Sequence, residues 1–196
     1  MTTSGFLAAP EVSTEAQRLF DDDVADAGYV MNLSKVWAYQ PATATHLFAL
    51  MGETHAVEHL SMRERAVLVA ACASTLGDAY CALAWGSRLA RTSDAETAAG
   101  VLRGDDSRLT PGEQAMARWA RKVASDPNRT TATDIQELRD AGLSDARIFA
   151  ITAYVALRIA FSTVNDALGA RPDAAFRSTA PEAVRDAVTF GRPIDG

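Results

Sequence analysis

The sequence predicts an all-α fold, on three observations. Apolar residues recur at spacings of three and four, helix-capping residues precede several of these runs, and no Asn-Gly hairpin or strand-length alternation occurs between turn signals. The chain has 196 residues, 48% hydrophobic and 22% charged, which suffices for one buried core. We expect a flexible N-terminus at 1–13, a single helical domain at 14–190 and a tail at 191–196.

The first part of the domain is expected to contain two helices. A short helix over 14–33 is interrupted by the acidic run 21–23. A second helix over 42–54 follows Pro41 and carries Leu47, Leu50 and Met51 on one face. The segment 51–59 is expected to be the end of this helix and a loop.

Two later helices begin with the same local pattern. Ser61 to Glu64 and Thr110 to Glu113 both form capping boxes, in which the hydroxyl and the glutamate satisfy backbone N–H groups reciprocally. A leucine precedes each box and an apolar run follows it. This repetition predicts a weak internal helical duplication.

The second half of the chain is expected to be helical to its end. The helix after Thr110 places a stripe of apolar residues on one face, and the segment 125–128 ends it. A short helix over 133–141 ends at Gly142, and a long helix begins at Ser144 and continues to Leu168. A last short helix covers 181–190. The stripe consists of Ala115, Met116, Trp119, Ala120 and Val123.

Composition excludes several classes of protein. The net charge is −6 and Lys35 and Lys122 are the only lysines, so the basic face that nucleic-acid binding needs is missing. No apolar stretch approaches a membrane span and no signal peptide begins the chain. Two cysteines, Cys72 and Cys81, are too few for a disulfide framework, and we expect a cytoplasmic protein.

Two segments carry a resemblance to a known family. Residues 60–85 (LSMRERAVLVAACASTLGDAYCALAW) and residues 109–169, with AGLSDA at 141–146 and NDALG at 165–169, resemble the carboxymuconolactone decarboxylase and alkyl hydroperoxidase D superfamily. The resemblance covers roughly residues 40–170 and implies an alkyl hydroperoxidase D-like helical bundle. It also implies a homo-oligomer, a trimer or a hexamer.

The redox motif of that superfamily is largely missing. Its redox members have two cysteines three positions apart, a histidine four after the second and a glutamate twelve before the first. With Cys81 as the second cysteine, Asp78 takes the position of the first, Trp85 that of the histidine and Ala66 that of the glutamate. A disulfide between the two motif positions is therefore impossible, and no relay is present to lower the pKa of Cys81.

Four residues are candidates for catalysis, each with a structural alternative. Cys81 is either a packed thiol or a nucleophile, and Asp78 either caps a helix or acts as an acid or base. Tyr80 either packs in the core or takes part in proton transfer. His55 is a possible general base, because imidazole titrates near neutral pH.

His55 and His59 have the spacing of a metal pair, but no third ligand follows, so no metal is expected.

Three further residues are candidates for substrate binding. Trp85 in place of histidine would make the pocket more apolar. Arg158 is the only charge between Ile148 and Val164; it is expected at a solvated or interface position, although within the pocket it would grip a carboxylate. Asn165 either orients a polar substrate group or caps a neighbouring helix.

These observations lead to three hypotheses about function. The first is a cofactor-independent acid/base enzyme for decarboxylation, isomerisation, ring opening or cyclisation of a small, largely apolar organic acid or ketone, as in secondary metabolism. The second is a one-cysteine thiol peroxidase or antioxidant protein that uses Cys81. The third is a non-catalytic helical protein that binds a ligand.

Overall fold

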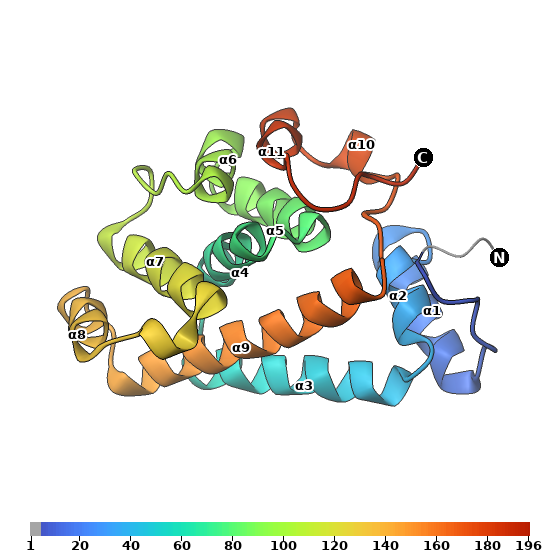
Figure 1. Ribbon diagram of the computed structural model, residues 1–196, viewed down its shortest axis with the longest axis horizontal. Coiled ribbons are helices and arrows are strands. Elements are labelled where there is room, and N and C mark those ends of the chain that lie inside the picture. The colour runs from blue at the N-terminus through green and yellow to red at the C-terminus, as the bar shows by residue number, and fades with distance from the viewer. Residues whose placement is uncertain (1–4) are drawn as a thin grey trace.

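The computed structural model describes residues 5–196, and these form eleven α-helices, one short 3₁₀ helix and no strand, which confirms the all-α prediction (Figure 1). The helices are α1 (Thr14–Ala27), α2 (Asn32–Trp37), α3 (Pro41–Val57), α4 (Met62–Leu76), α5 (Ala79–Thr92), α6 (Ala95–Arg103), α7 (Pro111–Ser125), α8 (Ala132–Asp140), α9 (Asp145–Ala167), α10 (Phe176–Thr179) and α11 (Glu182–Ala187), with the 3₁₀ helix at Pro127–Arg129.

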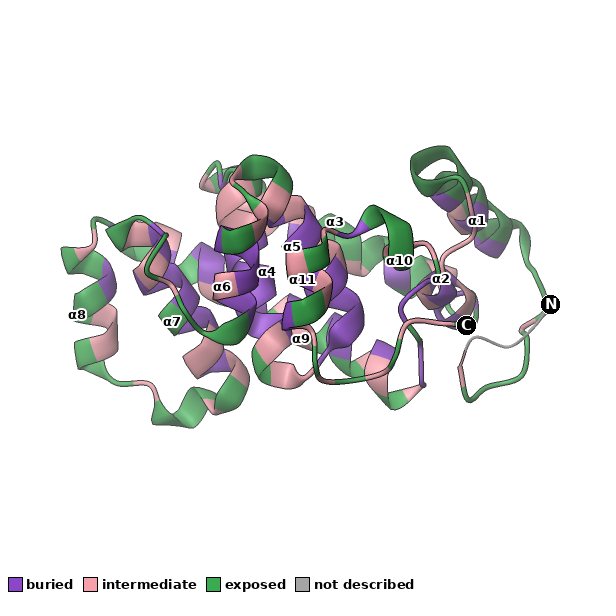
Figure 2. Cartoon of the chain, turned by 90° about the horizontal axis from the view of Figure 1, so that it is seen from above, coloured by how far each residue is buried: buried purple, intermediate pink, exposed green. Residues whose placement is uncertain are grey.

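The helices form a bundle around α4. The long helices α3 and α9 run antiparallel along one edge, α4 and α5 occupy the middle, and α6, α10 and α11 cover the opposite edge (Figure 1). Buried residues concentrate in α4, α5 and α9 (Figure 2). Every residue of α4 from Ala66 to Ala73 is buried, because neighbouring helices cover this helix on all sides.

Both predicted capping boxes are present. Ser61 accepts from the backbone N–H of Glu64 at the start of α4, and Thr110 accepts from that of Glu113 at the start of α7. The two helix starts are also linked to each other, because Arg63 Nε lies 2.5 Å from Glu113 Oε1. The predicted duplication thus corresponds to two equivalent helix ends that share an ion pair.

The first helix differs from its prediction. The acidic run does not interrupt α1, which continues to Ala27 and ends because Gly28 adopts a left-handed conformation with φ 84°. Asp21 and Asp22 face solvent, whereas Asp23 is buried and accepts a hydrogen bond from the backbone N–H of Met31 at 2.9 Å. Two aspartates of the run are thus solvated, and the third fixes the turn into α2.

Sequence analysis also missed α2, α6 and α10 as separate helices. The signal for α6 was present, because Asp94 caps it by accepting from the backbone N–H of Thr97 at 2.8 Å and Gly104 ends it. In contrast, α10 has four residues and no side-chain cap. Such a short helix depends on its packing rather than on local sequence.

The N-terminal and C-terminal parts of α9 bury different kinds of residue. Ser144 caps the helix, and Ile148 and Ile151 lie in the core. Further along, Ile159 and Val164 are only half-buried. The buried stripe continues instead through Arg158, Phe161, Ser162 and Asn165. A polar face of α9 is therefore directed into the protein.

The helix α9 is also long and apolar enough to cross a membrane by length and composition alone. Half of its most apolar window is buried inside the protein, as in the core helix of a helical bundle.

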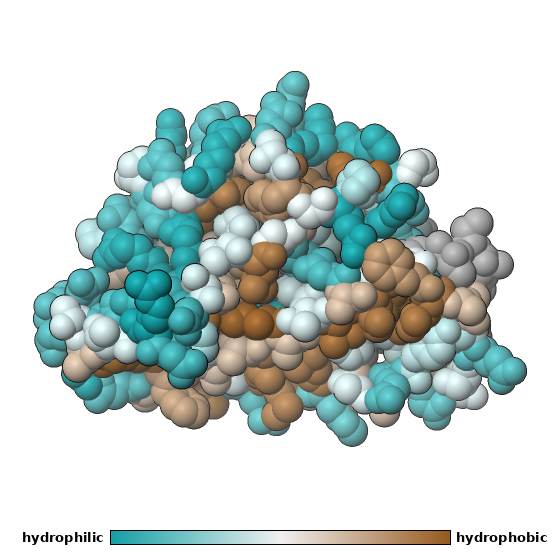
Figure 3. Space-filling model, viewed as in Figure 1, coloured by the Kyte–Doolittle hydropathy of each residue, from teal (hydrophilic) through white to brown (hydrophobic). Residues whose placement is uncertain are grey.

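An apolar surface lies along α3 and α9. Phe48 is 42% exposed, Leu50 49% and Val57 72% on α3, and Phe149 is 75% exposed on α9. Apolar side chains gather over these two helices in the lower part of the space-filling view (Figure 3). We call these four exposed residues the α3/α9 apolar face; Phe48 also contacts the Phe161 ring, with centres 5.2 Å apart.

The segments before α1 and after α11 contact the bundle. The backbone N–H of Phe6 donates to the carbonyl of Leu168 at 2.9 Å, and that of Asp195 donates to Pro172 at 2.8 Å. Residues 1–4 of the expected flexible N-terminus lie outside the described residues. The domain boundaries at 14, 190 and 191 stay predictions.

The capping box of α7 gives a test of the fold. We expect Thr110→Ala to lower the free energy of unfolding by about 1 kcal/mol, because the N–H of Glu113 loses its acceptor. Urea denaturation measures the change. Thr163→Ala, at an exposed position inside α9, is the control and should leave stability unchanged or slightly higher. Equal losses in both variants would contradict a role for the cap.

Candidate functional site

The candidate site begins at the turn between α4 and α5. Gly77 ends α4 in the left-handed conformation with φ 75°, and Asp78 caps α5 by accepting from the backbone N–H of Cys81 at 2.9 Å. The capping role expected for Asp78 is thus present. It places Cys81 in the first turn of α5, where the helix dipole favours a negative charge.

The C-terminal segment packs against this turn. Gly191 lies so close that a Cβ built on it would approach the carbonyl oxygen of Gly77 to 2.3 Å and the Cβ of Ala79 to 2.9 Å. Its φ of 70° also favours glycine. The segment therefore helps to exclude solvent from Asp78, which is fully buried, and from Cys81, which is 2% exposed.

Arg158 from α9 contacts the Cys81 thiol. Its Nη2 donates to Cys81 Sγ at 3.3 Å, and its Nη1 donates to Met51 Sδ at 3.8 Å. The hydroxyl of Ser162, one turn further along α9, donates to the same thiol sulfur at 3.8 Å. Arg158 is only 4% exposed. The expectation of a solvated or interface arginine is wrong, because the polar stripe of α9 faces α5.

Aromatic rings complete the surroundings of Arg158. Its Cζ lies 5.1 Å from the centre of the Trp85 ring and 5.0 Å from that of Phe161, both within cation–π distance. Among the described residues, no carboxylate forms an ion pair with Arg158. Its Nε is buried and has no acceptor. A guanidinium held by sulfur atoms and rings therefore stands beside the thiol.

Two charged groups act on the Cys81 thiol in opposite directions. Burial raises its pKa most, and the charge of the Asp78 carboxyl raises it further. Arg158 and the hydroxyl of Ser162 lower the pKa. Burial and Asp78 dominate, so the resting form of Cys81 is the thiol. The same burial raises the pKa of Cys72, on α4, to about 12.

Asp78 retains a free acceptor atom and has an acidic neighbour. Its Oδ2 is buried, and no N–H or O–H of the described residues donates to it. The pKa of Asp166, on α9, is raised to about 7 by burial and then by the charge of Asp78, while Arg192 lowers it. The site therefore contains a carboxyl group that can receive a proton and a second one that titrates near neutral pH.

The Tyr80 side chain contacts Asp173 and Phe176 rather than Cys81 or Arg158. Its hydroxyl donates to the Asp173 carboxylate, and its ring meets Phe176 edge-on with centres 5.7 Å apart. The other carboxylate oxygen of Asp173 accepts from the backbone N–H of Asn32 at 2.8 Å. Burial and Asp173 raise the pKa of Tyr80. This residue joins α5 to the segment before α10.

His55 lies within α3 rather than in a loop, because the helix continues to Val57. Its Nε2 is 3.1 Å from Arg65 Nη1, and its ring meets Tyr154 edge-on with centres 5.9 Å apart. Burial, and then the charge of Arg65, lower its pKa. The side chain of His59 is exposed, at the end of the helix.

Asn165 accepts a hydrogen bond from a tryptophan, whereas the sequence suggested either a substrate contact or a helix cap. Its Oδ1 accepts from Trp37 Nε1 at 2.8 Å, and the Trp37 ring stacks on Phe161 with centres 5.4 Å apart. The Nδ2 of Asn165 is buried and has no acceptor among the described residues. Asn165 thereby orients the aromatic pair that borders Arg158.

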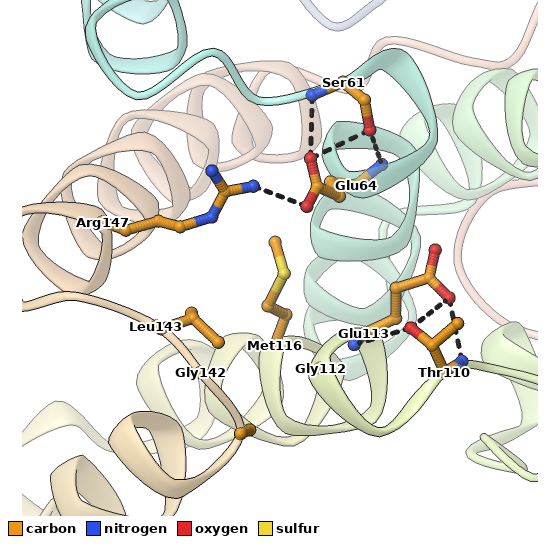
Figure 4. Close-up of a pocket in the computed structure, with 10 residues that line it drawn as sticks. Ser61, Glu64, Thr110, Gly112, Glu113, Met116, Gly142, Leu143 and Arg147 are labelled. Carbon is orange, nitrogen blue, oxygen red and sulfur yellow. Dashed lines mark hydrogen bonds and ion pairs between the residues drawn. The ribbon is translucent and has the colours of Figure 1, made fainter.

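A separate pocket of about 450 Å³ lies between the two capping boxes (Figure 4). Glu64, Glu113 and Met116 face it, and Arg147 reaches Glu64 across it at 2.5 Å. None of the residues predicted for catalysis or substrate binding lines this pocket. Its carboxylates are already engaged by the caps and by arginines.

The structure thus brings Asp78, Cys81, Trp85 and Arg158 together. Sequence analysis missed Ser162, Asp166 and Met51 as parts of this site. A signal for α9 existed, because residues 158, 162 and 165 follow helical spacing and place the polar residues on one face. No local pattern in α3 distinguishes Met51 from its neighbours.

Solved structures share this architecture. No protein-family model matches the chain, and no curated protein sequence matches it. The chain aligns with an uncharacterized peroxidase-related protein from Silicibacter sp. TM1040 at a TM-score of 0.77 and 21% identity, over 90% of this chain and 96% of that one. The alkylhydroperoxidase AhpD core protein from Ralstonia eutropha JMP134, also peroxidase-related, gives 0.73 and 21% over the same shares.

A third similar structure contains a ligand. It is the debrominase Bmp8, as a cysteine-to-alanine variant in complex with 2,3,4-tribromopyrrole, with a TM-score of 0.65 and 15% identity over 96% of each chain. These likenesses confirm the resemblance in segments 60–85 and 109–169 at the level of the fold. The chain has an alkyl hydroperoxidase D-like fold.

The acidic pair gives a prediction about protonation. We expect the pKa of Asp166 to be about 7, and we expect Asp78→Asn to lower it because one of its causes is the charge of Asp78. Carboxyl ¹³C chemical shifts measured against pH give both values. Asp186→Asn, at an exposed position on α11, should leave the pKa of Asp166 unchanged. A pKa near 4 in the unsubstituted protein would contradict the coupling.

The same pKa has a consequence for stability. The folded-state pKa of Asp166 exceeds its unfolded value, so the folded protein binds this proton more tightly. This contribution to stability is present below the unfolded pKa, about 4, and is lost as the pH rises towards 7. Asp166→Asn should flatten the dependence of unfolding free energy on pH in that window.

Proposed function

We propose that the chain is a single-cysteine thiol enzyme that reduces organic hydroperoxides with Cys81. One observation carries the proposal: Cys81 lies between the Asp78 carboxyl, which accepts from its backbone N–H and keeps one free oxygen, and a guanidinium that donates to its sulfur. Such a pair can take the proton of a thiol and stabilise the thiolate that remains. Asp78 and Arg158 then replace the motif residues that the sequence lacks.

The first chemical step uses both groups. The thiol proton of Cys81 moves to the Asp78 carboxylate, and the sulfur attacks the terminal oxygen of the hydroperoxide. The S–O bond forms while the O–O bond breaks, and the leaving alkoxide takes the proton back from Asp78. The sulfur is oxidised by two electrons to a sulfenic acid, and the peroxide is reduced to an alcohol. Arg158 stabilises the negative charge that moves from sulfur to oxygen.

An external low-molecular-weight thiol completes the cycle. One such thiol attacks the sulfenic acid and gives a mixed disulfide and water, and a second releases the Cys81 thiol together with the disulfide of the external thiol. The partner has to come from outside, because Cys72 is buried in the core within α4 and both cysteines are free.

The surroundings of the thiol favour a small apolar substrate. Met51 and Phe161 are buried beside Arg158, and Trp85 is half-buried. Because Cys81 is only 2% exposed, a substrate reaches it where neighbouring side chains move aside. Two peroxidase-related proteins of the same fold support this reaction type.

The acid/base hypothesis from the sequence has less support. The Tyr80 hydroxyl is engaged by Asp173. His55 faces Arg65, whose charge lowers the pKa of the imidazole. Among the described residues, no acid/base pair lies around a substrate site. Four reactions therefore stay predictions: decarboxylation, isomerisation, ring opening and cyclisation.

Reductive debromination is a second candidate, favoured by the structure of Bmp8 with its brominated pyrrole. In this reaction the Cys81 sulfur attacks bromine, the S–Br bond forms as the C–Br bond breaks, and the carbon takes a proton from Asp78. An external thiol then gives a mixed disulfide and releases bromide. Both candidates need the same thiolate, so bromide release is measured beside hydroperoxide consumption.

We also propose a cytoplasmic homo-oligomer, a trimer or a hexamer, as the resemblance implies. The exposed apolar side chains of the α3/α9 apolar face support a second copy of the chain as its partner, because large exposed apolar side chains are often buried at interfaces. Two free cysteines agree with a reducing compartment.

The proposed reaction is tested at Cys81. We expect Cys81→Ala to abolish cumene hydroperoxide consumption in the presence of dithiothreitol, and Arg158→Met to reduce it at least about 100-fold, on the scale of one lost charge-stabilising donor. Peptide mass spectrometry after dimedone trapping should find the sulfenic acid on Cys81. Cys72→Ala is the matched control and should retain activity. Full turnover by Cys81→Ala would overturn the proposal.

The oligomer is tested on the α3/α9 apolar face. Sedimentation equilibrium should give a trimer or a hexamer for the unsubstituted protein. Phe149→Asp should shift the mass towards the monomer, because a carboxylate would be buried in the interface. Val24→Asp, at a comparably exposed apolar position on α1, is the control and should keep the assembly intact. A monomer at all concentrations would contradict the assembly.

A further inference from the structure

We infer that Arg65, Arg88 and Arg158 form an anion site that binds the carboxylate of an organic acid beside Cys81. The inference rests on the proposed function in one respect: in the proposed reaction, the organic acid bound at this site is the hydroperoxide substrate. The three arginines come from α4, α5 and α9. Arg88 and Arg158 lie over the Trp85 ring, and Arg65 contacts His55 beside Tyr154.

The geometry gathers the three guanidinium groups around two rings. The Cζ of Arg88 lies 4.9 Å from the centre of the Trp85 ring, and that of Arg158 lies 5.1 Å from it. Arg65 contacts His55, whose ring meets Tyr154 edge-on. Burial raises the pKa of Tyr154, and the charges of all three arginines lower it.

The positive charge of this cluster is not balanced by the chain. Within the described residues, none of the three arginines forms an ion pair with a carboxylate. Among residues 5–196, the buried Nε atoms of Arg65 and Arg158 have no acceptor, and Arg88 donates only to the carbonyl of Ala84 at 3.2 Å. Burial and the charges of Arg91 and Arg158 lower the pKa of Arg88.

Arg158 is buried and Arg65 and Arg88 are half-buried. An unpaired cation away from water is costly, so the cluster indicates a missing anion. A guanidinium offers parallel N–H groups that match the two oxygens of a carboxylate. The indole of Trp85 and the phenol ring of Tyr154 supply apolar walls for the body of the acid. Since Arg158 also donates to Cys81 Sγ, a carboxylate bound here would hold the rest of the molecule near the thiol.

Benzoate is a direct probe of the site. We titrate it into the unsubstituted protein and follow binding by isothermal calorimetry and tryptophan fluorescence, with benzyl alcohol as the neutral analogue. Benzoate should bind at least about tenfold more tightly than benzyl alcohol, which corresponds to about 1.4 kcal/mol. Arg88→Gln and Arg65→Gln should each remove that preference. Arg118→Gln, an exposed arginine on α7, is the charge-matched control and should leave it unchanged.

The titration is repeated in Cys81→Ala to separate binding from chemistry. If benzoate binds there with the same dependence on Arg88 while hydroperoxide turnover does not need Cys81, the anion site stands and the proposed reaction fails. If turnover needs Cys81 but benzoate does not bind to either protein, the anion site is wrong and the reaction stands. Inorganic phosphate that displaces benzoate at equal concentration would also overturn the assignment to an organic carboxylate.

Discussion

The candidate site depends on a guanidinium buried against a thiol. Arg158 reaches Cys81 Sγ at 3.3 Å from α9, and Asp78 holds the same residue from the start of α5. Much of the surrounding structure serves to keep this contact dry: Trp85 and Phe161 cover the guanidinium, and Trp37 stacks on Phe161 while it donates to Asn165. In a dry environment a single charge has a larger effect on a neighbouring sulfur than it has in water. The balance between Asp78 and Arg158 therefore sets whether Cys81 is an inert thiol or a nucleophile.

Asp78 and Trp85 stand at two of the positions that the resemblance marks for redox residues. Asp78 stands where the resemblance expects a cysteine, and it combines a structural role with a chemical one, since one oxygen caps α5 and the other is free. Trp85 stands where the resemblance expects a histidine, and it supplies a surface for cations rather than a proton. The charge that the histidine would have provided comes instead from Arg158 on a different helix.

The fold was largely predictable because its signals are local. Both capping boxes, the apolar stripe of α7 and the start of α9 at Ser144 depend on residues within one or two turns. The site was only partly predictable, because its contacts join positions far apart in the chain. The polar residues at 158, 162 and 165 were readable as one helical face, but the sequence does not state which face of α9 meets α5. Arg158 was therefore expected near solvent, although packing against the thiol buries it.

Burial in the folded protein protects both thiols from oxidation, and this matters when the protein is prepared. Cys72 and Cys81 sit at 1% and 2% exposure, and helices from widely separated parts of the chain enclose them. An unfolded or half-assembled chain lacks that enclosure, and its cysteines regain the ordinary acidity of a free thiol, near pH 8.5. Oxidation by air into crosslinked aggregates is then a risk during refolding rather than during storage. A reductant is needed most before the last helices have packed onto the bundle.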